Sequence, residues 1–309
     1  MTTTVLLDAN SIGYYEHYGA RLNSGDLQTQ SIFGFVHKAR ALKIAYPGCG
    51  IMALWDGRAD WRFEMCPSYK SNRADDPKKA AVKAEYQKAR PYIGTALQHM
   101  GVRQITSDFH EADDLAGYFV KRLSANPENR IVLHTSDHDW YQMVRENVVI
   151  RDPKEADFIL RRNNFQEITG YRTPLAFLEG KALQGDASDV IPGIPKLGEK
   201  TAAEFLATWG SVFNFFAAVD SGEYVPKKRA SKTATSLHPE EFLASREGRK
   251  IFLRNLKVMQ LLNVAKPNEA VTRVVQGKPD KEAFASLCEE LAFVSILRDL
   301  DNFFKPFES

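Results

Sequence analysis

Ile131-Val132-Leu133-His134-Thr135-Ser136-Asp137-His138-Asp139-Trp140 is the stretch from which the fold of this chain is best derived. Its apolar first half predicts a short strand buried on both faces, and two acids, Asp137 and Asp139, follow directly. In open parallel sheets, ligands bind outside the carboxyl ends of the strands, so both acids are expected where chemistry takes place. The alternative is that Ser136-Asp137 caps a following helix and that the helix dipole favours Asp139.

Other predicted strands also end at acids, at corresponding points along the chain. The acid-terminated segments are Val5-Leu6-Leu7 before Asp8, Ile51-Met52-Ala53-Leu54-Trp55 before Asp56, and Val102 to Thr106 before the cluster Glu111-Ala112-Asp113-Asp114. For Asp8 taken alone, a helix cap is as plausible as a functional role. The repetition favours a shared site at one edge of a sheet.

The cluster Glu111-Ala112-Asp113-Asp114 puts three acids into the first turn of one predicted helix. A helix dipole favours an acid there by roughly 0.3–1 kcal/mol. Two like charges about 4 Å apart repel by about 4 kcal/mol at an effective dielectric constant of about 20. The dipole therefore explains only part of the cluster, whereas a bound divalent cation would turn the repulsion into attraction.

The alternation of short strands with helical segments predicts an α/β fold with a mostly parallel, twisted sheet flanked by helices. From about residue 164 onward the pattern is predominantly helical, with a helix over Pro174–Leu183 and another from Glu199. We expect an N-terminal domain over residues 1–165 and a C-terminal helical region over residues 166–309. A chain of 309 residues with 44% hydrophobic residues can bury a core of this size.

The formal net charge of +2 hides an uneven distribution, with acids at strand ends and Lys and Arg crowded into residues 70–90 and 227–232. Three widely spaced cysteines indicate neither a zinc site nor a disulfide framework. The N-terminus has no secretory pattern, and no stretch is long enough to span a bilayer. These features predict a cytoplasmic protein without a membrane partner.

Residues 58–100 interleave basic and aromatic residues, a pattern that suits single-stranded nucleic acid. A solvated helix is the default explanation for most of these lysines. Lys70 and Arg73 are exceptions, because they precede the helix in Tyr69-Lys70-Ser71-Asn72-Arg73, where a loop places them near the strand-end acids. The polar loop at residues 221–240 is interpreted as solvated.

A Pro- and Gly-rich hairpin separates the two predicted helices at 174–183 and 199 onward. It follows Gly185-Asp186-Ala187-Ser188-Asp189 and runs from Ile191 to Gly198. Such a hairpin exposes backbone N–H groups and a helix N-terminus toward a phosphate, and Lys196 and Lys200 favour that role over a plain connection. An oxygen-only set of acids without His or Cys suits Mg²⁺ or Mn²⁺, two of which can assist phosphodiester hydrolysis.

These motifs together resemble those of the structure-specific 5′ nucleases, the flap endonuclease family that includes bacteriophage 5′-3′ exonucleases and the nuclease domain of bacterial DNA polymerase I. The resemblance runs from Asp8 to about Phe205. It is carried, in order, by Leu7-Asp8-Ala9-Asn10, Trp55-Asp56-Gly57, Tyr69-Lys70-Ser71-Asn72-Arg73, Glu111-Ala112-Asp113-Asp114, Thr135-Ser136-Asp137-His138-Asp139-Trp140, Gly185-Asp186-Ala187-Ser188-Asp189 and the hairpin to Ala203.

The resemblance implies a PIN-like sheet, a helical arch at about 71–100 and a helix-hairpin-helix at about 174–208. It implies two metal ions, one held by Asp8, Asp56, Glu111 and Asp113, the other by Asp137, Asp139, Asp186 and Asp189, with Asp114 and Asp137 near both. Catalytic roles would fall to Lys70, Arg73 and Asp137, while Tyr69 would stack on a base. DNA contacts would come from Tyr69, Lys70, Arg73, Lys196, Gly198 and Lys200, with a K⁺ ion at the hairpin. Lys196 departs from the family pattern, which has glycine there.

The expected function is Mg²⁺- or Mn²⁺-dependent cleavage of DNA at or near a 5′ end, flap or nick, in replication or repair, by a monomer. RNA in RNA–DNA hybrids is an expected further substrate. The length is typical of a stand-alone phage or bacterial accessory enzyme. Two alternatives remain open: a branched-DNA binding protein that has lost catalysis, and a PIN-type ribonuclease.

Overall fold

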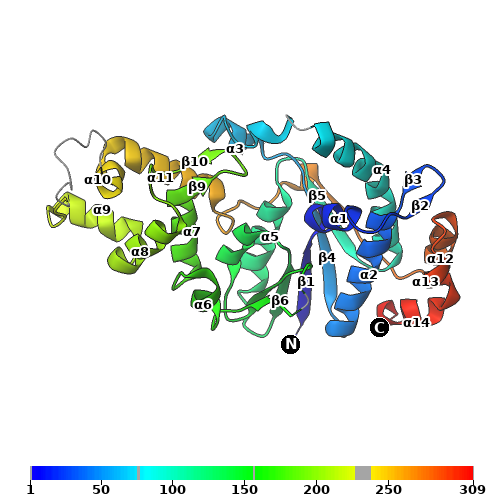
Figure 1. Ribbon diagram of the computed structural model, residues 1–309. Coiled ribbons are helices and arrows are strands. Elements are labelled where there is room, and N and C mark those ends of the chain that lie inside the picture. Colours follow the sequence, from blue (N-terminus) through cyan, green and yellow to red (C-terminus); the bar gives the residue numbers. More distant parts are fainter. Residues whose placement is uncertain (1, 75–76, 156, 227–237, 309) are drawn as a thin grey trace.

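A computed structural model describes residues 2–74, 77–155, 157–226 and 238–308, with only the backbone described at residues 73–74 and 78–79. Its centre is a seven-stranded sheet in the order β11-β5-β4-β1-β6-β7-β8 (Figure 1). The strands are β1 (Thr3–Asp8), β4 (Gly50–Trp55), β5 (Arg103–Ser107), β6 (Arg130–His134), β7 (Val148–Arg151), β8 (Ile159–Leu160) and β11 (Thr272–Val275).

The five central strands are parallel, and the two edge strands β8 and β11 pair antiparallel with their neighbours. The predicted α/β class with a mostly parallel sheet is therefore confirmed. Two small ribbons accompany the sheet, formed by β2 (Asn23–Ser24) with β3 (Leu27–Gln28) and by β9 (Gly185–Asp186) with β10 (Ile191–Pro192). Leu27–Gln28 pairs with β2 directly before the helix that begins at Gln30.

Side-chain alternation along the strands produces two apolar cores, one on each face of the sheet. Val5 and Leu7 of β1 face one core, whereas Leu6 faces the other. The first core is covered by α1 (Ala9–His17), α2 (Gln30–Ala45), α4 (Pro77–His99), α12 (Lys281–Glu290), α13 (Val294–Arg298), α14 (Leu300–Phe304) and η4 (Lys305–Phe307).

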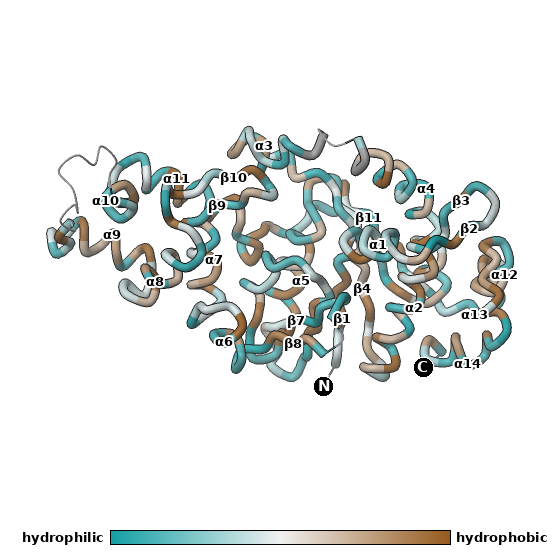
Figure 2. Tube along the Cα trace, in the orientation of Figure 1, coloured by the Kyte–Doolittle hydropathy of each residue, from teal (hydrophilic) through white to brown (hydrophobic). Residues whose placement is uncertain are grey.

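The second core lies under α5 (Ala112–Leu123) and η2 (His138–Met143) and continues into the C-terminal helices. The remaining elements are α3 (Asp60–Met65), η1 (Ser71–Ala74), α6 (Phe165–Thr169), α7 (Pro174–Gln184), α8 (Glu199–Trp209), α9 (Val212–Ser221), α10 (Pro239–Ala244), α11 (Arg246–Met259) and η3 (Glu269–Val271). Figure 2 shows apolar residues recurring along β4 and in the helices at both ends of the molecule, such as α8 and α12.

The C-terminal part of the chain returns to the sheet, which corrects the prediction of one helical region over residues 166–309. β11 adds a strand beside β5, and Phe284, Phe303 and Phe304 are buried in the core shared with α2 and α4. The physical reason is that the β5 edge has unpaired backbone groups, which β11 satisfies. Among the described residues no single helix is long and apolar enough to cross a bilayer; only the bent pair α8 and α9, taken together, reaches that length and composition.

Gly57, directly after Asp56, allows the end of β4 to approach the loop after β5. Its N–H donates to the carbonyl of His110 at 2.9 Å, and a Cβ at this position would overlap the carbonyl oxygen of Ser107. This close approach brings Asp56 next to the first turn of α5, where Ala112 N–H donates to Asp56 Oδ1 at 2.9 Å. Gly57 therefore helps to place two of the acid motifs side by side.

We predict that Gly57→Ala lowers the free energy of unfolding by at least about 1–3 kcal/mol, because backbone must move to accept the methyl group. Gly50→Ala at the start of β4 is the control, since no heavy atom lies within 4 Å of its added Cβ. It should change stability by less than about 0.5 kcal/mol. Urea denaturation of both variants measures the difference, and equal midpoints would contradict the close approach.

Candidate active site

Four acids from separate elements meet at the carboxyl edge of the parallel strands. Asp8 ends β1, Asp56 follows β4, Asp137 follows β6, and Asp113 lies in the first turn of α5. They lie close enough for their charges to interact: Asp8 with Asp113, Asp56 and Asp137, and Asp113 with Asp56 and Asp137. The sheet thus brings together residues that are more than 100 positions apart in the chain.

This crowding makes ionisation of the acids difficult. Burial, followed by repulsion from Asp113 and Asp56, raises the pKa of Asp8 to about 8. Burial and repulsion from Asp139 raise the pKa of Asp137 to about 7. Burial and repulsion from Asp137 and Asp56 also raise the pKa of Asp113 well above its usual range. Concentrated negative charge of this kind stabilises a bound cation.

The capping role and the functional role predicted for these acids coexist. Asp8 Oδ1 accepts from Ser11 N–H at the start of α1, and Asp137 Oδ1 accepts from Asp139 N–H at the start of η2. The second oxygen of Asp8 accepts from Thr135 Oγ1 at 2.9 Å, and Asp113 Oδ1 accepts from Trp140 Nε1 at 2.7 Å. These hydrogen bonds hold the carboxylates in fixed orientations against their mutual repulsion.

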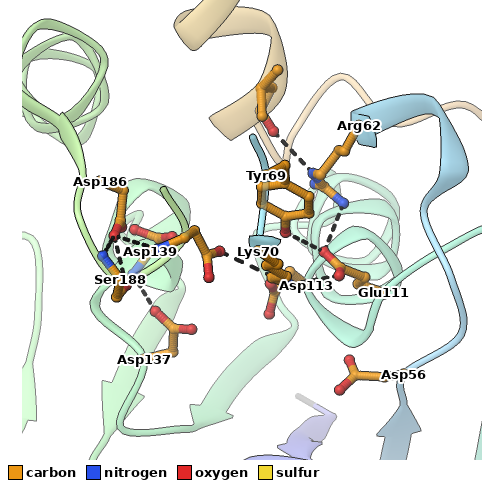
Figure 3. A network of polar contacts seen from close by, with 12 residues as sticks. Asp56, Arg62, Tyr69, Lys70, Glu111, Asp113, Asp137, Asp139, Asp186 and Ser188 are labelled. Carbon is orange, nitrogen blue, oxygen red and sulfur yellow. Dashed lines mark hydrogen bonds and ion pairs between the residues drawn. The ribbon is translucent and has the colours of Figure 1, made fainter. Parts of the chain in front are cut away.

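Two of these acids, Asp113 and Asp137, line a polar cavity of about 470 Å³. It is lined by Ser11, Lys70, Asp113, Ser136, Asp137, His138, Asp139, Lys181, Asp186, Ser188 and Asp189. Figure 3 shows Lys70 between the group of Asp137, Asp139 and Asp186 and the group around Glu111. Residues from both predicted domains therefore contribute to one cavity.

Lys70 lies in this cavity, as the sequence predicted. Its Nζ is 2.6 Å from Glu111 Oε1 and 3.9 Å from Asp189 Oδ2. The residue has a φ of 54°, in the left-handed region, and its backbone N–H donates to the Asp189 carbonyl at 2.8 Å. This fixed, unusual backbone aims the ammonium group at the acids. Although burial opposes ionisation of Glu111, Lys70 and Arg62 lower its pKa.

Lys181 of α7 is a site residue that the sequence reasoning missed. Its Nζ contacts Asp139 Oδ1 and Asp186 Oδ2, both at 2.9 Å. Burial would raise the pKa of Asp186, but hydrogen bonds from Ser188 and Lys181 outweigh it and lower the pKa to about 2. The available signal was a lysine five residues before Asp186 on the helix that leads into the acid motif.

Arg62 of α3 is a second missed residue, and it gives Asp114 a different role from the predicted one. The guanidinium is 3% exposed and donates to both oxygens of Asp114, at 2.7 and 2.6 Å, and to Glu111 Oε2 at 3.1 Å. Asp114 also accepts from Glu111 N–H and is fully buried. Both of its oxygens are engaged by Arg62, so Asp114 supports Glu111 in this structure, and its role as a metal ligand stays a prediction.

Tyr69 also departs from its predicted role of stacking on a base. Its side chain is 4% exposed, its ring packs edge-on against Phe63, and its hydroxyl donates to Glu111 Oε2 at 2.7 Å. Burial and the Glu111 charge raise the pKa of this phenol. The ring is held inside the apolar core under α5, so it orients Glu111 instead of presenting a free face.

The predicted DNA contacts of the hairpin are exposed beside the cavity. Lys196, Gly198 and Lys200 lie on the surface, and Gly198 starts α8 without a side-chain cap. Lys196 has a φ of 63°, so it adopts the left-handed backbone that glycine favours, although it replaces the glycine of the pattern. The side chain of Arg73 and the basic residues at 227–232 lie outside the described residues.

The nine predicted ligands do not form a ready-made cage. In the described parts of the chain, no three Asp, Glu, His or Cys side chains are grouped in a geometry that holds a metal ion. Instead, Lys70 and Lys181 neutralise Glu111, Asp139 and Asp186, while Asp8, Asp113 and Asp137 stay close together with raised pKa values. An oxygen-only set with excess acid fits Mg²⁺ or Mn²⁺, which bind through few carboxylates and keep several waters.

The fold and the acid-lined cavity define a nuclease. Residues 3–170 match the family model described as the 5′-3′ exonuclease N-terminal resolvase-like domain, and residues 172–247 match that of the 5′-3′ exonuclease C-terminal SAM fold. The chain therefore belongs to the 5′-3′ exonuclease family, as the sequence motifs predicted.

Relatives and solved structures agree with this assignment. DNA polymerase I of Streptococcus pneumoniae (strain R6) is 30% identical over 225 residues, which cover 70% of this chain and 25% of the polymerase. The chain thus spans about a quarter of the length of that relative. The thermostable DNA polymerase I of Thermus filiformis is 26% identical over 299 residues, covering 96% of this chain and 33% of the polymerase.

The fold is similar to the T5 D15 protein co-crystallised with metal ions, with a TM-score of 0.67, 18% identity and coverage of 99% and 98% of the two chains. It is also similar to the catalytic core of Rad2 in complex with a DNA substrate, with a TM-score of 0.58, 15% identity and coverage of 99% and 91%. At these identities the likeness concerns the fold.

We predict that Arg62→Met lowers the free energy of unfolding by about 3–5 kcal/mol, because Glu111 and Asp114 would be left as uncompensated buried charges. Arg58→Met is the matched control: Arg58 pairs with Asp60, but both side chains are largely exposed. That loss should cost about 0–1 kcal/mol. Urea denaturation compares the two, and adding Asp114→Asn to Arg62→Met should recover part of the stability. Similar costs for Arg62→Met and Arg58→Met would contradict the network.

The raised pKa values of Asp8 and Asp137 predict that the metal-free protein loses stability between pH 6.5 and 8. In this window the native state retains protons on these acids that the unfolded chain, with an Asp pKa of 3.8, has already released. Below pH 6.5 the buried His134, whose pKa burial lowers to about 4, opposes the trend. Thermal unfolding of the wild type in EDTA, measured across this pH range, tests the prediction. Asp137→Asn should reduce the dependence of stability on pH. A wild-type stability that does not change with pH would contradict the crowding of the acids.

Proposed function

We propose that this chain is a Mg²⁺- or Mn²⁺-dependent nuclease that hydrolyses DNA phosphodiesters at or near a 5′ end, flap or nick, in replication or repair. The observation that supports it most is the cavity of about 470 Å³ that Lys70 shares with five acids from different segments: Asp113, Asp137, Asp139, Asp186 and Asp189. Family membership supports the same reaction class.

Asp8, Asp56, Glu111 and Asp113 would hold one ion, and Asp137, Asp139, Asp186 and Asp189 a second. Bound divalent ions activate a water molecule and stabilise the leaving oxygen in phosphodiester hydrolysis. Before the ions bind, the ammonium groups of Lys70 and Lys181 would reduce the repulsion among these acids. The metal ions would then replace these ammonium groups as partners of the carboxylates. The positions of their ammonium groups, 2.6–2.9 Å from carboxylate oxygens, support this assignment.

Lys70 has a second proposed task, because an ammonium group inside the cavity can contact a phosphate oxygen of the substrate. It is 12% exposed, so little water competes for that contact. Arg73 is proposed as a further phosphate contact three residues on. Tyr69 and Arg62 do not touch the substrate in this proposal; they hold Glu111 in place.

The hairpin between α7 and α8 is the proposed site for the duplex backbone. Two exposed lysines and the uncapped first turn of α8 offer cationic and N–H groups to a phosphate. Lys196 adopts the left-handed backbone that the turn requires, and we propose that the hairpin binds a K⁺ ion. RNA in RNA–DNA hybrids as a substrate, the monomeric state and the cytoplasmic location stay predictions.

We expect purified protein with Mg²⁺ to cut a 5′-labelled flap, and Asp137→Asn to reduce the rate by at least 100-fold, on the order of an electrostatic contribution to catalysis. Asp220→Asn is the control, since this exposed acid of α9 pairs with Arg249 far along the chain. In EDTA, both variants should bind DNA with an affinity within about threefold of the wild type, which corresponds to less than about 1 kcal/mol.

A blocked 5′ end and an RNA–DNA hybrid, added to the same assay, separate exonuclease from flap cutting and test the RNA prediction. Flap binding by the wild type without any Mg²⁺- or Mn²⁺-dependent product would overturn the proposal and favour a branched-DNA binding protein. Preference for single-stranded RNA over branched DNA would favour a PIN-type ribonuclease.

A further inference from the structure

A second cavity, of about 460 Å³, lies between α4 and the β5–β11 edge of the sheet. Its lining includes Trp55, Gln87, Arg90, Gln104 and Arg273. No Asp or Glu is among the described residues that line it. We call it the α4–β11 cavity. It is separate from the acid-lined cavity, with which it shares no lining residue.

The α4–β11 cavity is a built and cationic site. Trp55 Nε1 donates to Gln104 Oε1 at 3.1 Å, and Gln104, which is 6% exposed, donates from Nε2 to the carbonyl of Gly94 at 2.8 Å. The Arg90 guanidinium lies 4.9 Å from the centroid of the Trp55 ring and makes no ion pair with any described residue. Arg273 on the opposite wall pairs with Asp108, which is outside the lining.

The α4–β11 cavity lies next to the strand-end acids along the sheet. Asp137, Asp8 and Asp56 follow β6, β1 and β4, which are successive strands, and the cavity continues the row over β4, β5 and β11. Its lining begins at Trp55, the residue before Asp56, and crosses β5 to β11, which is roughly 10 Å at about 4.8 Å between strands. The hairpin, by contrast, adjoins α7, which packs on η2 after β6 (Figure 1).

We propose that the α4–β11 cavity binds a phosphate of single-stranded nucleic acid that extends past the acids on the side away from the hairpin. A strand supported at the hairpin and crossing the row of acids reaches this cavity next. Arg90 supplies the charge, with no acid among the described residues to neutralise it, and its contact with the Trp55 ring helps to orient the guanidinium. The inference rests on the proposed function, because it assigns a further contact to the same substrate.

The test is binding in EDTA, measured by fluorescence anisotropy against salt, for two DNA substrates with the same duplex. One has a 5′ single-stranded extension of about ten nucleotides and the other has none. Arg90→Gln should weaken binding of the extended substrate about tenfold and reduce its salt slope by about 0.7, the value for one lost phosphate contact on a single strand. Binding of the substrate without an extension should be unchanged.

Lys88→Gln is the matched control, because it removes the same charge from the same helix at a side chain that is 60% exposed and pairs with Glu85. Arg273→Gln provides a second probe if Arg90→Gln does not fold. It should weaken binding of the extended substrate and leave binding of the other substrate unchanged. Equal effects of Lys88→Gln and Arg90→Gln, or equal losses on both substrates, would overturn the proposal. If the wild type binds the extension but cuts nothing with Mg²⁺, the proposed function fails while the α4–β11 cavity stands.

Discussion

Repulsion among carboxylates that one sheet edge forces together is the constraint on which this structure depends. Parallel strands all end on the same side, so Asp8, Asp56 and Asp137 cannot separate without breaking the ladders β4-β1-β6. The chain limits the cost locally, by hydrogen bonds from Thr135 and Trp140 and by caps at helix starts. What remains unrelieved is the raised pKa of the central acids, and this is the property a cation site needs.

Three basic side chains form ion pairs with most of the other acids, and the depth at which each basic side chain is buried indicates its role. Arg62 is buried beneath the site and holds Glu111 and Asp114 with a geometry that no solvent disturbs. Lys70 and Lys181 face the cavity, each with a single ammonium group at the end of a long side chain. A buried, bidentate arginine suits permanent structure, whereas lysine forms point-charge contacts that stronger cations or phosphates can replace. The residue type at each position thus fits its depth.

The same buried arginine joins the two halves of the chain. Arg62 Nε donates to the carbonyl of Val258 at the end of α11, and Gln142 contacts Met259 and Leu261 beside it. Residues 258–261 are therefore held against α3, α5 and η2 by polar contacts that the acids also use. This coupling explains why Asp186 of β9 and Asp137 after β6 line one cavity although they belong to segments matched by different family models.

Sequence reasoning reached the sheet and most of the acids, because strand-end carboxylates are local signals: an apolar run followed by Asp is visible without knowledge of tertiary structure. It missed Lys181 and Arg62, whose importance depends on which residues they meet across the fold. It misassigned Tyr69 and did not show how deeply Asp114 lies, because a motif specifies residue type but not depth, and both side chains turn inward. The return of β11 and the C-terminal phenylalanines was also hidden, since a four-residue edge strand has no distinctive pattern.

The arrangement of charge along the sheet edge carries the functional argument one step further. Basic side chains lie on both sides of the acids. Lys196 and Lys200 of the hairpin lie beyond β6, and Arg90 and Arg273 lie beyond β4. The net charge of +2 shows nothing of this alternation, in which a central negative group lies between two basic ones. A polyanion is attracted to the flanks and repelled at the centre until cations bind there. Under the proposed function, binding and cleavage would therefore be separable, because a phosphate would approach the acids only after divalent ions had bound to them.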